Sequence, residues 1–271
     1  MKPSCRGLSL TELLVATTLL ATATAGAVAS LSQAYGARRD AGLLQELHER
    51  AQYVLATLEP ELQMAGYFGT ESPPAQVSGD VPDSALRCGP EVIRRIDLPV
   101  QVLAGWPLPC APQGGGQVPG SQVLVLRRAG ARLASAPEPG RAQWLTNAGT
   151  GVGQLFWQGD APWSPAAVAQ GAELRELVLR IFYVARNADG EAGLPALRVK
   201  NLTSIAGAPA FIDTEVMNGV ENLQVELLPA TGRPTGVRVH LRVRAQGAPV
   251  RGATAPQVLE TTRLFTLRNA G

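Results

Sequence analysis

A single apolar run near the N-terminus constrains this chain more than any other feature. It extends from Leu8 to Leu31 and contains one charged side chain, Glu12. About 24 residues at ~1.5 Å per residue are enough for a helix to cross the hydrocarbon layer of a membrane. Threonines dilute the run, but a helical threonine can return its hydroxyl hydrogen bond to a carbonyl one turn earlier. We therefore expect a membrane-spanning helix over residues 8–31.

The charges around this run predict its orientation and set a requirement for Glu12. Lys2 and Arg6 precede the run and no acidic residue does, which favours a cytoplasmic N-terminus and an exported remainder. A carboxylate in a membrane span costs on the order of 2–3 kcal/mol, so Glu12 needs a cationic partner. Cleavage after Gly7 would create one, because the new α-amine of Leu8, or that of a neighbouring segment of the same kind, is positively charged.

Two conventional interpretations of the run stay open. The first is an ordinary secretory signal, because small-x-small sites occur before Ser30. The second is a simple uncleaved membrane anchor. Glu12 is unusual in the core of a signal peptide, and helical sequence follows the run where a linker would otherwise be expected.

The sequence after the span predicts an amphipathic continuation of the same helix. Apolar residues recur at steps of three and four, the period of one helix face. They are Leu44, Leu47, Ala51, Val54, Leu55, Leu58 and Leu62. No proline interrupts the chain between Leu8 and Glu59, so we expect one helix of roughly 50 residues, about 75 Å long. It ends at Pro60 or, if it passes that residue, at Gly66.

The remainder of the chain predicts a β-rich head. Residues 70–120 are rich in glycine and proline and read as loops. Beyond them, apolar or alternating runs separated by turns indicate strands. The expected strands are Val123–Leu126, Leu177–Val184, Leu197–Lys200, Val220–Leu227, Val237–Arg244 and Thr262–Leu267. A helix followed by consecutive strands predicts an α+β fold with an antiparallel sheet.

The cysteines are consistent with export. Cys5 lies before Gly7 and would be lost on cleavage, which leaves Cys88 and Cys110 as an even pair in a compartment where disulfides persist. A bridge between them would close about 21 intervening residues and contribute roughly 3 kcal/mol. Free thiols and a metal site are the alternatives, but neither cysteine belongs to a C-x-x-C pair and both histidines are isolated. We expect the disulfide.

Composition argues against several classes of function. Without Lys2 and Arg6 the chain has 24 − 2 = 22 basic residues against 22 acidic ones, so overall charge gives no indication of a nucleic-acid partner. Common nucleophile-elbow, zinc-protease and phosphate-loop motifs are missing from the sequence. With two histidines and no clustered acids, we expect neither an enzyme nor a cofactor.

Two further patterns have simple structural explanations. The expected strand 237–244 places four side chains on one face: Arg238, His240, Arg242 and Arg244. This face suits DNA, an anionic surface or an acidic subunit, but a solvated or salt-bridged sheet face is the simpler interpretation. The segment Asn187–Gly190 resembles part of a calcium loop but lacks the further acidic ligands, which favours a hairpin turn.

The N-terminal pattern resembles the class III leader of type IV pilins and pseudopilins. Gly7 is followed by an apolar residue, and glutamate stands fifth in the apolar run. In that family a prepilin peptidase cleaves after the glycine and methylates the new amine, with which the glutamate pairs during fibre assembly. The positions carried over are Gly7, Leu8 and Glu12. The family usually has phenylalanine where this chain has Leu8.

Four later segments are similar to PilW-type minor pilins. Met64–Gly69 resembles the family's "MAGY.G" motif after the helix, and Gly219–Val225 resembles its "GVENLQV" strand. Ile181–Asn187 looks like its tyrosine-bearing strand, and Arg263–Asn269 looks like its C-terminus. Residues 70–120 match nothing in that family.

The resemblance implies a pilin-like fold with a cleaved leader over 1–7, a helical stalk over 8–66 and a head over 67–271. It implies a single-pass inner-membrane protein with a periplasmic head that later enters a pilus. The implied partners are other minor pilins, the major pilin, the prepilin peptidase and the inner-membrane assembly platform. The implied function is priming or capping of pilus assembly, which supports twitching motility, with cell adhesion through the 70–120 loops as a second role. A type II secretion pseudopilin and an exported binding module with an ordinary signal peptide are the alternatives.

Overall fold

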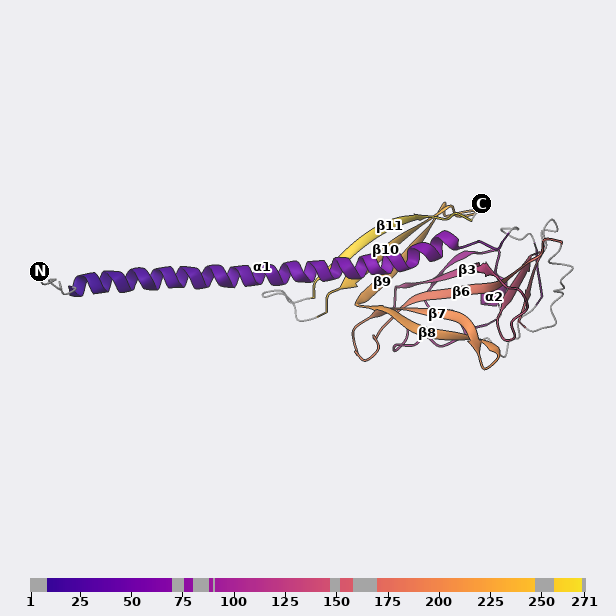
Figure 1. Ribbon diagram of the computed structural model, residues 1–271, viewed down its shortest axis with the longest axis horizontal. Coiled ribbons are helices and arrows are strands. Elements are labelled where there is room, and N and C mark those ends of the chain that lie inside the picture. The colour runs from indigo at the N-terminus through magenta and orange to yellow at the C-terminus, as the bar shows by residue number, and fades with distance from the viewer. Residues whose placement is uncertain are drawn as a thin grey trace, which may run out of the picture.

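The computed structural model shows an elongated molecule in which one long helix ends in a β-rich head (Figure 1). It describes residues 9–69, 76–79, 88–89, 91–146, 152–157, 170–246 and 256–269. The expected leader 1–7 and the residues of the expected processing site, Gly7 and Leu8, lie outside the described residues.

The helix α1 spans Leu10–Met64 without interruption. Ser9 caps its first turn, and leucine and alanine, which favour helix, make up much of its first half. Pro60 lies inside the helix, so the helix continues past the earlier of its two expected end points. It ends just before Gly66, whose φ of +81° is incompatible with a further helical turn.

The two halves of α1 have different surroundings. The first half projects from the head and none of its apolar segment is buried, whereas the second half packs on the head (Figure 1). The buried face confirms the predicted stripe: Leu47, Ala51, Val54, Leu55, Leu58 and Leu62. Leu44 is the exception: it remains half exposed, whereas the neighbouring Leu43 packs against the core.

The described part of the head contains two sheets. The larger has eight strands in the order β1-β5-β4-β6-β3-β2, with β7 paired to β6 and β8 paired to β7. Their bounds are β1 Gln76–Gly79, β2 Val100–Ala104, β3 Gln122–Leu133, β4 Gln143–Thr146, β5 Val152–Phe156, β6 Glu173–Ala185, β7 Ala196–Ile205 and β8 Ala208–Asn218. The smaller has the order β11-β10-β9, with β9 Val220–Leu228, β10 Gly236–Arg244 and β11 Val258–Thr266. A short helix, α2, spans Glu91–Arg94.

The expectation of one antiparallel sheet needs correction. The fold is α+β, but the strands form two sheets, and β1 pairs with β5 in parallel. The distance between β1 and β5 in the sequence permits a parallel pair, because parallel strands need a connection longer than a hairpin turn. The other pairings are antiparallel, including the predicted hairpin between β6 and β7.

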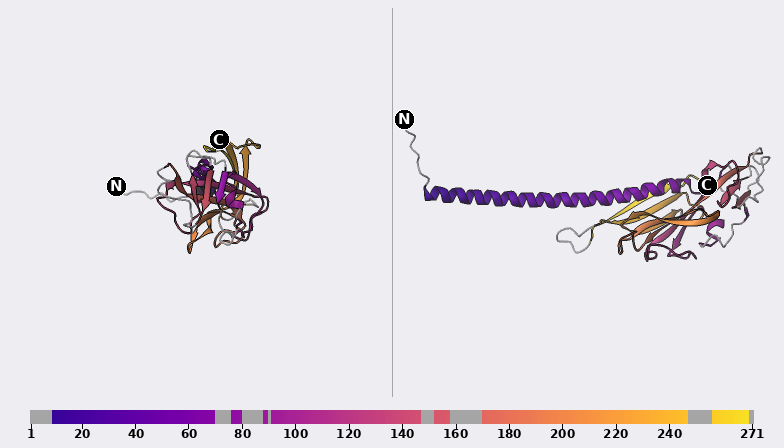
Figure 2. Two further views of the ribbon diagram at one scale, coloured as in Figure 1. Left: turned by 90° about the vertical axis from the view of Figure 1, so that its right-hand side faces the viewer. Right: turned by 60° about the horizontal axis from the view of Figure 1, so that its bottom comes forward.

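Two hydrophobic clusters hold these layers together. One lies between α1, the inner face of the smaller sheet and one face of the larger sheet, and includes Leu55, Phe182 and Val239. The other lies on the opposite face of the larger sheet and includes Ile93 of α2 and Trp144. The views in Figure 2 show the smaller sheet beside α1 and the larger sheet below it. The larger sheet is therefore buried on both faces.

Candidate functional site

The exposed half of α1 is the most unusual surface of the molecule. Within the described residues α1 is the one helix long and apolar enough to cross a membrane. Its large apolar side chains are open to solvent: Leu10, Leu13, Leu14, Val15, Leu19, Leu20, Val28 and Leu31. A contiguous apolar surface of this size is characteristic of a membrane or protein contact.

Glu12 forms a capping box with Ser9 at the start of α1. The Ser9 amide donates to Glu12 Oε2 at 2.9 Å, and the Glu12 amide donates to Ser9 Oγ at 3.3 Å. This arrangement satisfies two amides that helix geometry leaves without partners. The Glu12 carboxylate is thereby held at the N-terminal end of the helix, four residues after Leu8 in the sequence.

The threonines in the apolar half bond as their helical setting predicts. Thr17 Oγ1 donates to the Leu14 carbonyl at 3.0 Å, and Thr24 Oγ1 donates to the Leu20 carbonyl at 2.9 Å. Each hydroxyl is satisfied inside the helix, which lowers the cost of placing it in an apolar environment.

A buried ion-pair cluster fixes the second half of α1 to the larger sheet. Glu61 lies on the buried face of α1, where Arg180 Nη1 of β6 approaches its carboxylate at 2.9 Å and Arg128 Nε of β3 at 3.3 Å. Glu59, two residues earlier on α1, pairs with Arg263 of β11 at 2.9 Å. The stalk and both sheets therefore meet around these two glutamates.

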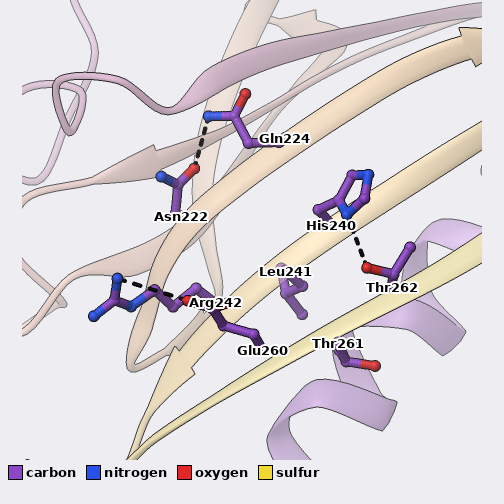
Figure 3. Close-up of a pocket in the computed structure, with 8 residues that line it drawn as sticks. All are labelled: Asn222, Gln224, His240, Leu241, Arg242, Glu260, Thr261 and Thr262. Atoms are coloured by element: carbon purple, nitrogen blue, oxygen red, sulfur yellow. Dashed lines mark hydrogen bonds and ion pairs between the residues drawn. The ribbon is translucent and has the colours of Figure 1, made fainter.

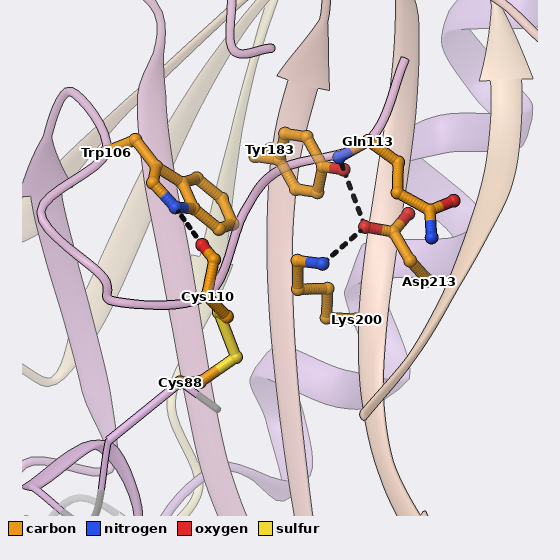
Figure 4. Close-up of a disulfide and its surroundings, with 7 residues drawn as sticks. All are labelled: Cys88, Trp106, Cys110, Gln113, Tyr183, Lys200 and Asp213. Atoms are coloured by element: carbon orange, nitrogen blue, oxygen red, sulfur yellow. Dashed lines mark hydrogen bonds and ion pairs between the residues drawn. A yellow bond between two sulfur atoms is a disulfide. The ribbon is translucent and has the colours of Figure 1, made fainter. Parts of the chain in front are cut away.

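The Cys88–Cys110 disulfide is present, as predicted. It lies on the face of the larger sheet opposite α1 (Figure 4). Trp106 Nε1 donates to the Cys110 carbonyl at 2.6 Å, and the Trp106 ring packs edge-on against Tyr183 of β6. The bridge therefore anchors a segment that covers the sheet.

A buried charged cluster lies beneath this segment. Asp213 of β8 accepts from Lys200 Nζ at 2.7 Å, from Tyr183 Oη at 2.6 Å and from Arg198 Nε at 2.8 Å (Figure 4 shows the first two). The Gln113 amide donates to Tyr183 Oη at 2.8 Å. The cluster thus joins β6, β7, β8 and the disulfide-bearing segment.

The cluster shifts the pKa values of its members. Burial alone would raise the pKa of Asp213, but the hydrogen bonds from Lys200, Tyr183 and Arg198 outweigh it and hold that pKa below 3.8. Burial, with the hydrogen bond to Asp213, raises the pKa of Tyr183 above its ordinary value. Asp213 is therefore charged and Tyr183 neutral at neutral pH.

A cavity of about 750 Å³ opens beside the disulfide. Prolines, aliphatic side chains and Phe211 form most of its described wall, and Lys200 is its one described charged residue. Lys200 is already paired with Asp213. The described wall therefore offers no unpaired acid, base or nucleophile for catalysis.

The basic face of β10 is a salt-bridged sheet face, in agreement with the simpler interpretation. Arg238 pairs with Glu226, and Arg242 pairs with Glu221 at 3.0 Å. The remaining two side chains also have partners: His240 bonds Thr262, and Arg244 lies 3.6 Å from Glu221. A shallow hollow of about 230 Å³ lies over these strands (Figure 3). Each of the four basic side chains is thus engaged within its own sheet.

The segment Asn187–Gly190 is a turn, as the simpler interpretation predicted. Ala188 bridges to Glu191, and Asn187 Oδ1 accepts from the Gly193 amide. Asp189 pairs with Arg198 at 2.6 Å, so its carboxylate points toward the sheet. Among the described residues, no group of three potential ligands is placed to hold a metal ion.

Two motifs of the sequence explain local packing. In Met64–Gly69, Phe68 is buried against Trp144, and the Ala129 amide donates to the Tyr67 carbonyl at 2.6 Å. Gly219, at the start of the second motif, has φ of +75° and lies against the Arg244 carbonyl. Both motifs are junctions between elements.

The residues of the buried cluster are not predicted by the sequence patterns considered above. No strand is expected over the segment that contains Asp213, and 70–120 shows no chemical pattern. The signal that could have revealed a strand here is the alternation of the β-branched residues Ile212, Thr214 and Val216 with the acids Asp213 and Glu215. Comparison with protein-family models, curated proteins and solved structures finds no match for this chain.

Proposed function

We propose that this chain is a PilW-type minor pilin that primes or caps type IV pilus assembly. The observation that carries the proposal is the division of α1 into an exposed apolar half and a half buried in the head. The general shape, a long apolar helix on a β head, is pilin-like (Figure 1). An exposed apolar helix needs lipid or other helices to cover it, and a pilin uses both in turn.

The continuity of α1 favours this proposal over an ordinary secretory signal. A signal peptidase cut before Ser30 would fall inside an unbroken helix and leave its exposed remainder attached to the head. A cut after Gly7 falls just before the capping residue Ser9, so the helix survives intact. A removable signal is usually followed by a separate folded domain.

In the proposed mechanism Glu12 offsets a subunit terminal amine. Before assembly its carboxylate is engaged by the Ser9 amide. A methylated amine at Leu8 of the same or a neighbouring chain would replace that neutral partner with a cation, which is a stronger interaction in an apolar environment. In this proposal the head has no enzymatic role and contacts other minor pilins. At the exposed tip of a pilus it would also contact a surface, which would support adhesion.

The first experiment is the mass of the N-terminal peptide of the mature protein from native membranes. The proposal predicts a chain that begins at Leu8 with a methylated amine. A chain beginning near Ser30 would instead establish an ordinary signal peptide and remove Glu12 from the mature protein.

A matched pair of variants tests the assembly role. Glu12→Gln keeps size and most hydrogen bonding but removes the charge, and it should abolish surface pili. Glu49→Gln, on the exposed side of α1 near the head, should leave them unchanged.

Deletion of the gene separates a pilus subunit from a secretion pseudopilin. Loss of pili and twitching with normal enzyme secretion supports the pilus assignment. The reverse phenotype would assign the chain to a type II secretion system.

A further inference from the structure

The outer edge of β11 is an open strand edge nine residues long. β11 pairs with β10 in unbroken register from Val258 to Thr266, and no described strand pairs with its other side. The edge contains no proline and no bulge. Such an edge is a ready template for another strand.

The register shows which backbone groups this edge presents. Leu267 donates to Thr235, and Ala245 donates to Gln257, so odd-numbered residues of β11 bond β10. The even-numbered residues, from Val258 to Thr266, therefore point their amides and carbonyls outward. Their amides have no hydrogen-bond partner among the described residues.

The long strands at the other sheet edges are protected in ways that β11 is not. On β8, Pro209 removes an amide donor, the register shifts at Leu197/Arg198, and Asp213 points a charge inward. Each of these devices discourages strand addition.

At the other edge of the smaller sheet, side chains accept hydrogen bonds from amides of β9. The Leu223 amide donates to Ser121 Oγ at 3.2 Å, and the Val225 amide donates to Gln122 Oε1 at 2.6 Å. The remaining edge strands, β1 and β2, are only four and five residues long. Within the described strands, the open edge is thus concentrated on β11.

The side chains beside this edge indicate what chemistry would fit. The side chains of the even-numbered residues lie on the solvent-exposed face of the sheet. In this row the exposed aliphatic residues Val258 and Leu264 flank Glu260 and Thr262. The Glu260 side chain is 73% exposed, and its one ion-pair partner among the described residues, Arg242, is 3.7 Å away. An added strand would therefore gain from aliphatic residues beside Val258 and Leu264 and from a basic residue beside Glu260.

We infer that β11 is a strand-addition site for an extended segment of another protein. The segment has alternating β-branched residues and a lysine or arginine placed beside Glu260. A second copy of this chain pairing its own β11 antiparallel fits less well, because the even-numbered row contains no basic residue to meet Glu260. The inference concerns the head alone and stands whether or not α1 enters a pilus.

Synthetic nine-residue peptides of alternating valine and threonine provide the probe. One carries lysine at its third position and another at its seventh, which places the lysine beside Glu260 in a parallel or an antiparallel pairing. A peptide with glutamate in place of lysine and a peptide with a central proline are the controls. Binding of each labelled peptide to the full-length protein in detergent is measured by fluorescence anisotropy.

One lysine peptide should bind about two- to tenfold more tightly than its glutamate counterpart. Amide hydrogen exchange, resolved to single residues, should show even-numbered β11 amides becoming protected on binding. Odd-numbered amides should be protected with or without peptide. This alternation is specific to strand addition and is not expected for binding to the sheet face.

Two variants at one position distinguish the contribution of the backbone amide to peptide binding from that of the side chain. Thr262→Pro removes one outward amide at a position where an edge strand tolerates proline, and it should weaken binding roughly three- to tenfold. Thr262→Ala removes the same side chain, including its bond to His240, but keeps the amide and should bind as the parent does. Circular dichroism of both variants verifies that the head remains folded.

Several results would overturn the inference. They are no measurable binding of either lysine peptide, equal binding by the two Thr262 variants, and binding without protection of the even-numbered amides. Protection of those amides at high protein concentration without peptide would replace the proposed partner with a second copy of this chain.

Discussion

Gly66 lies against the backbone carbonyl of Asn269, so close that a Cβ placed on Gly66 would stand 2.6 Å from that oxygen. The Gly66 amide donates to the Arg127 carbonyl at 3.0 Å, and Asn269 Nδ2 donates to the Gln63 carbonyl at 3.1 Å. The end of α1, strand β3 and the C-terminal segment therefore meet at one glycine. Two features require glycine at this position: the close approach of the Asn269 carbonyl, and the φ of +81°, which disfavours any side chain.

Replacing Gly66 with alanine should destabilise the head by roughly 3 kcal/mol or more, because backbone strain adds to a clash with backbone atoms. Gly105→Ala is the matched control: Gly105 also has positive φ, but a Cβ at that position would meet nothing within 4 Å. That change should cost only about 1–2 kcal/mol. Urea unfolding of both proteins, followed by tryptophan fluorescence, measures the difference. Equal losses would mean that the contact with Asn269 contributes nothing.

Glu61 should contribute more to stability than any exposed glutamate of α1. Glu61→Gln leaves Arg128 and Arg180 without a counter-charge at a buried helix–sheet contact. We expect a loss of roughly 2–3 kcal/mol, below the value for a fully buried pair because both arginines keep some access to water. Glu59→Gln, whose partner Arg263 is more exposed, should cost about 0–1 kcal/mol. Thermal unfolding of the two variants tests this order.

The stalk was predictable because its determinants are local in sequence. An apolar run, a three-and-four residue stripe and the absence of proline up to Glu59 define α1 within a few residues of its observed ends. The disulfide was predictable because, of the three cysteines, only Cys88 and Cys110 lie beyond the apolar run. Glu61 on the buried face was not predicted, since its partners Arg128 and Arg180 come from strands distant in sequence.

The head was less predictable because its pairing is mostly non-local. The strands expected from apolar runs are present, but five others are short or mixed in character and were missed: β4, β5 and β8, and also β1 and β2, which lie in the stretch 70–120 that was expected to form loops. The parallel pairing of β1 with β5 joins Gln76 to Val152 and leaves no local signal. The charged cluster around Asp213 was missed for the same reason: Lys200 and Asp213 become neighbours only through the β7–β8 register.

Asp213 should make the head sensitive to acid. Its pKa is held below 3.8 in the folded state, so the unfolded chain takes up the proton first as the pH falls. The stabilisation by Asp213 is therefore fully present above pH 3.8 and is lost as the pH falls through the folded pKa. Asp213→Asn should be less stable than the parent at neutral pH, and the gap in melting temperature should narrow below pH 3.8.

A control variant separates this effect from general acid denaturation. Glu226→Gln removes a half-exposed carboxylate paired with Arg238. Its free energy of unfolding should stay within about 1 kcal/mol of the parent value across the same pH range. A constant gap in melting temperature between Asp213→Asn and the parent, persisting well below the folded pKa, would contradict the assigned role of Asp213.

The disulfide should stabilise the head through the segment it anchors. Cys88 and Cys110 are 22 residues apart, so the bridge restricts a loop whose closure is worth about 3 kcal/mol in the chain-entropy model. The double variant Cys88→Ser/Cys110→Ser should lose about that much in urea unfolding. It should also lose the near-ultraviolet signal of Trp106, since its ring contact with Tyr183 depends on the anchored segment. Reductant should reproduce both changes in the parent and have no effect on the double variant. If the reduced parent kept its unfolding midpoint, the segment would be held by Trp106 and Gln113 without help from the bridge.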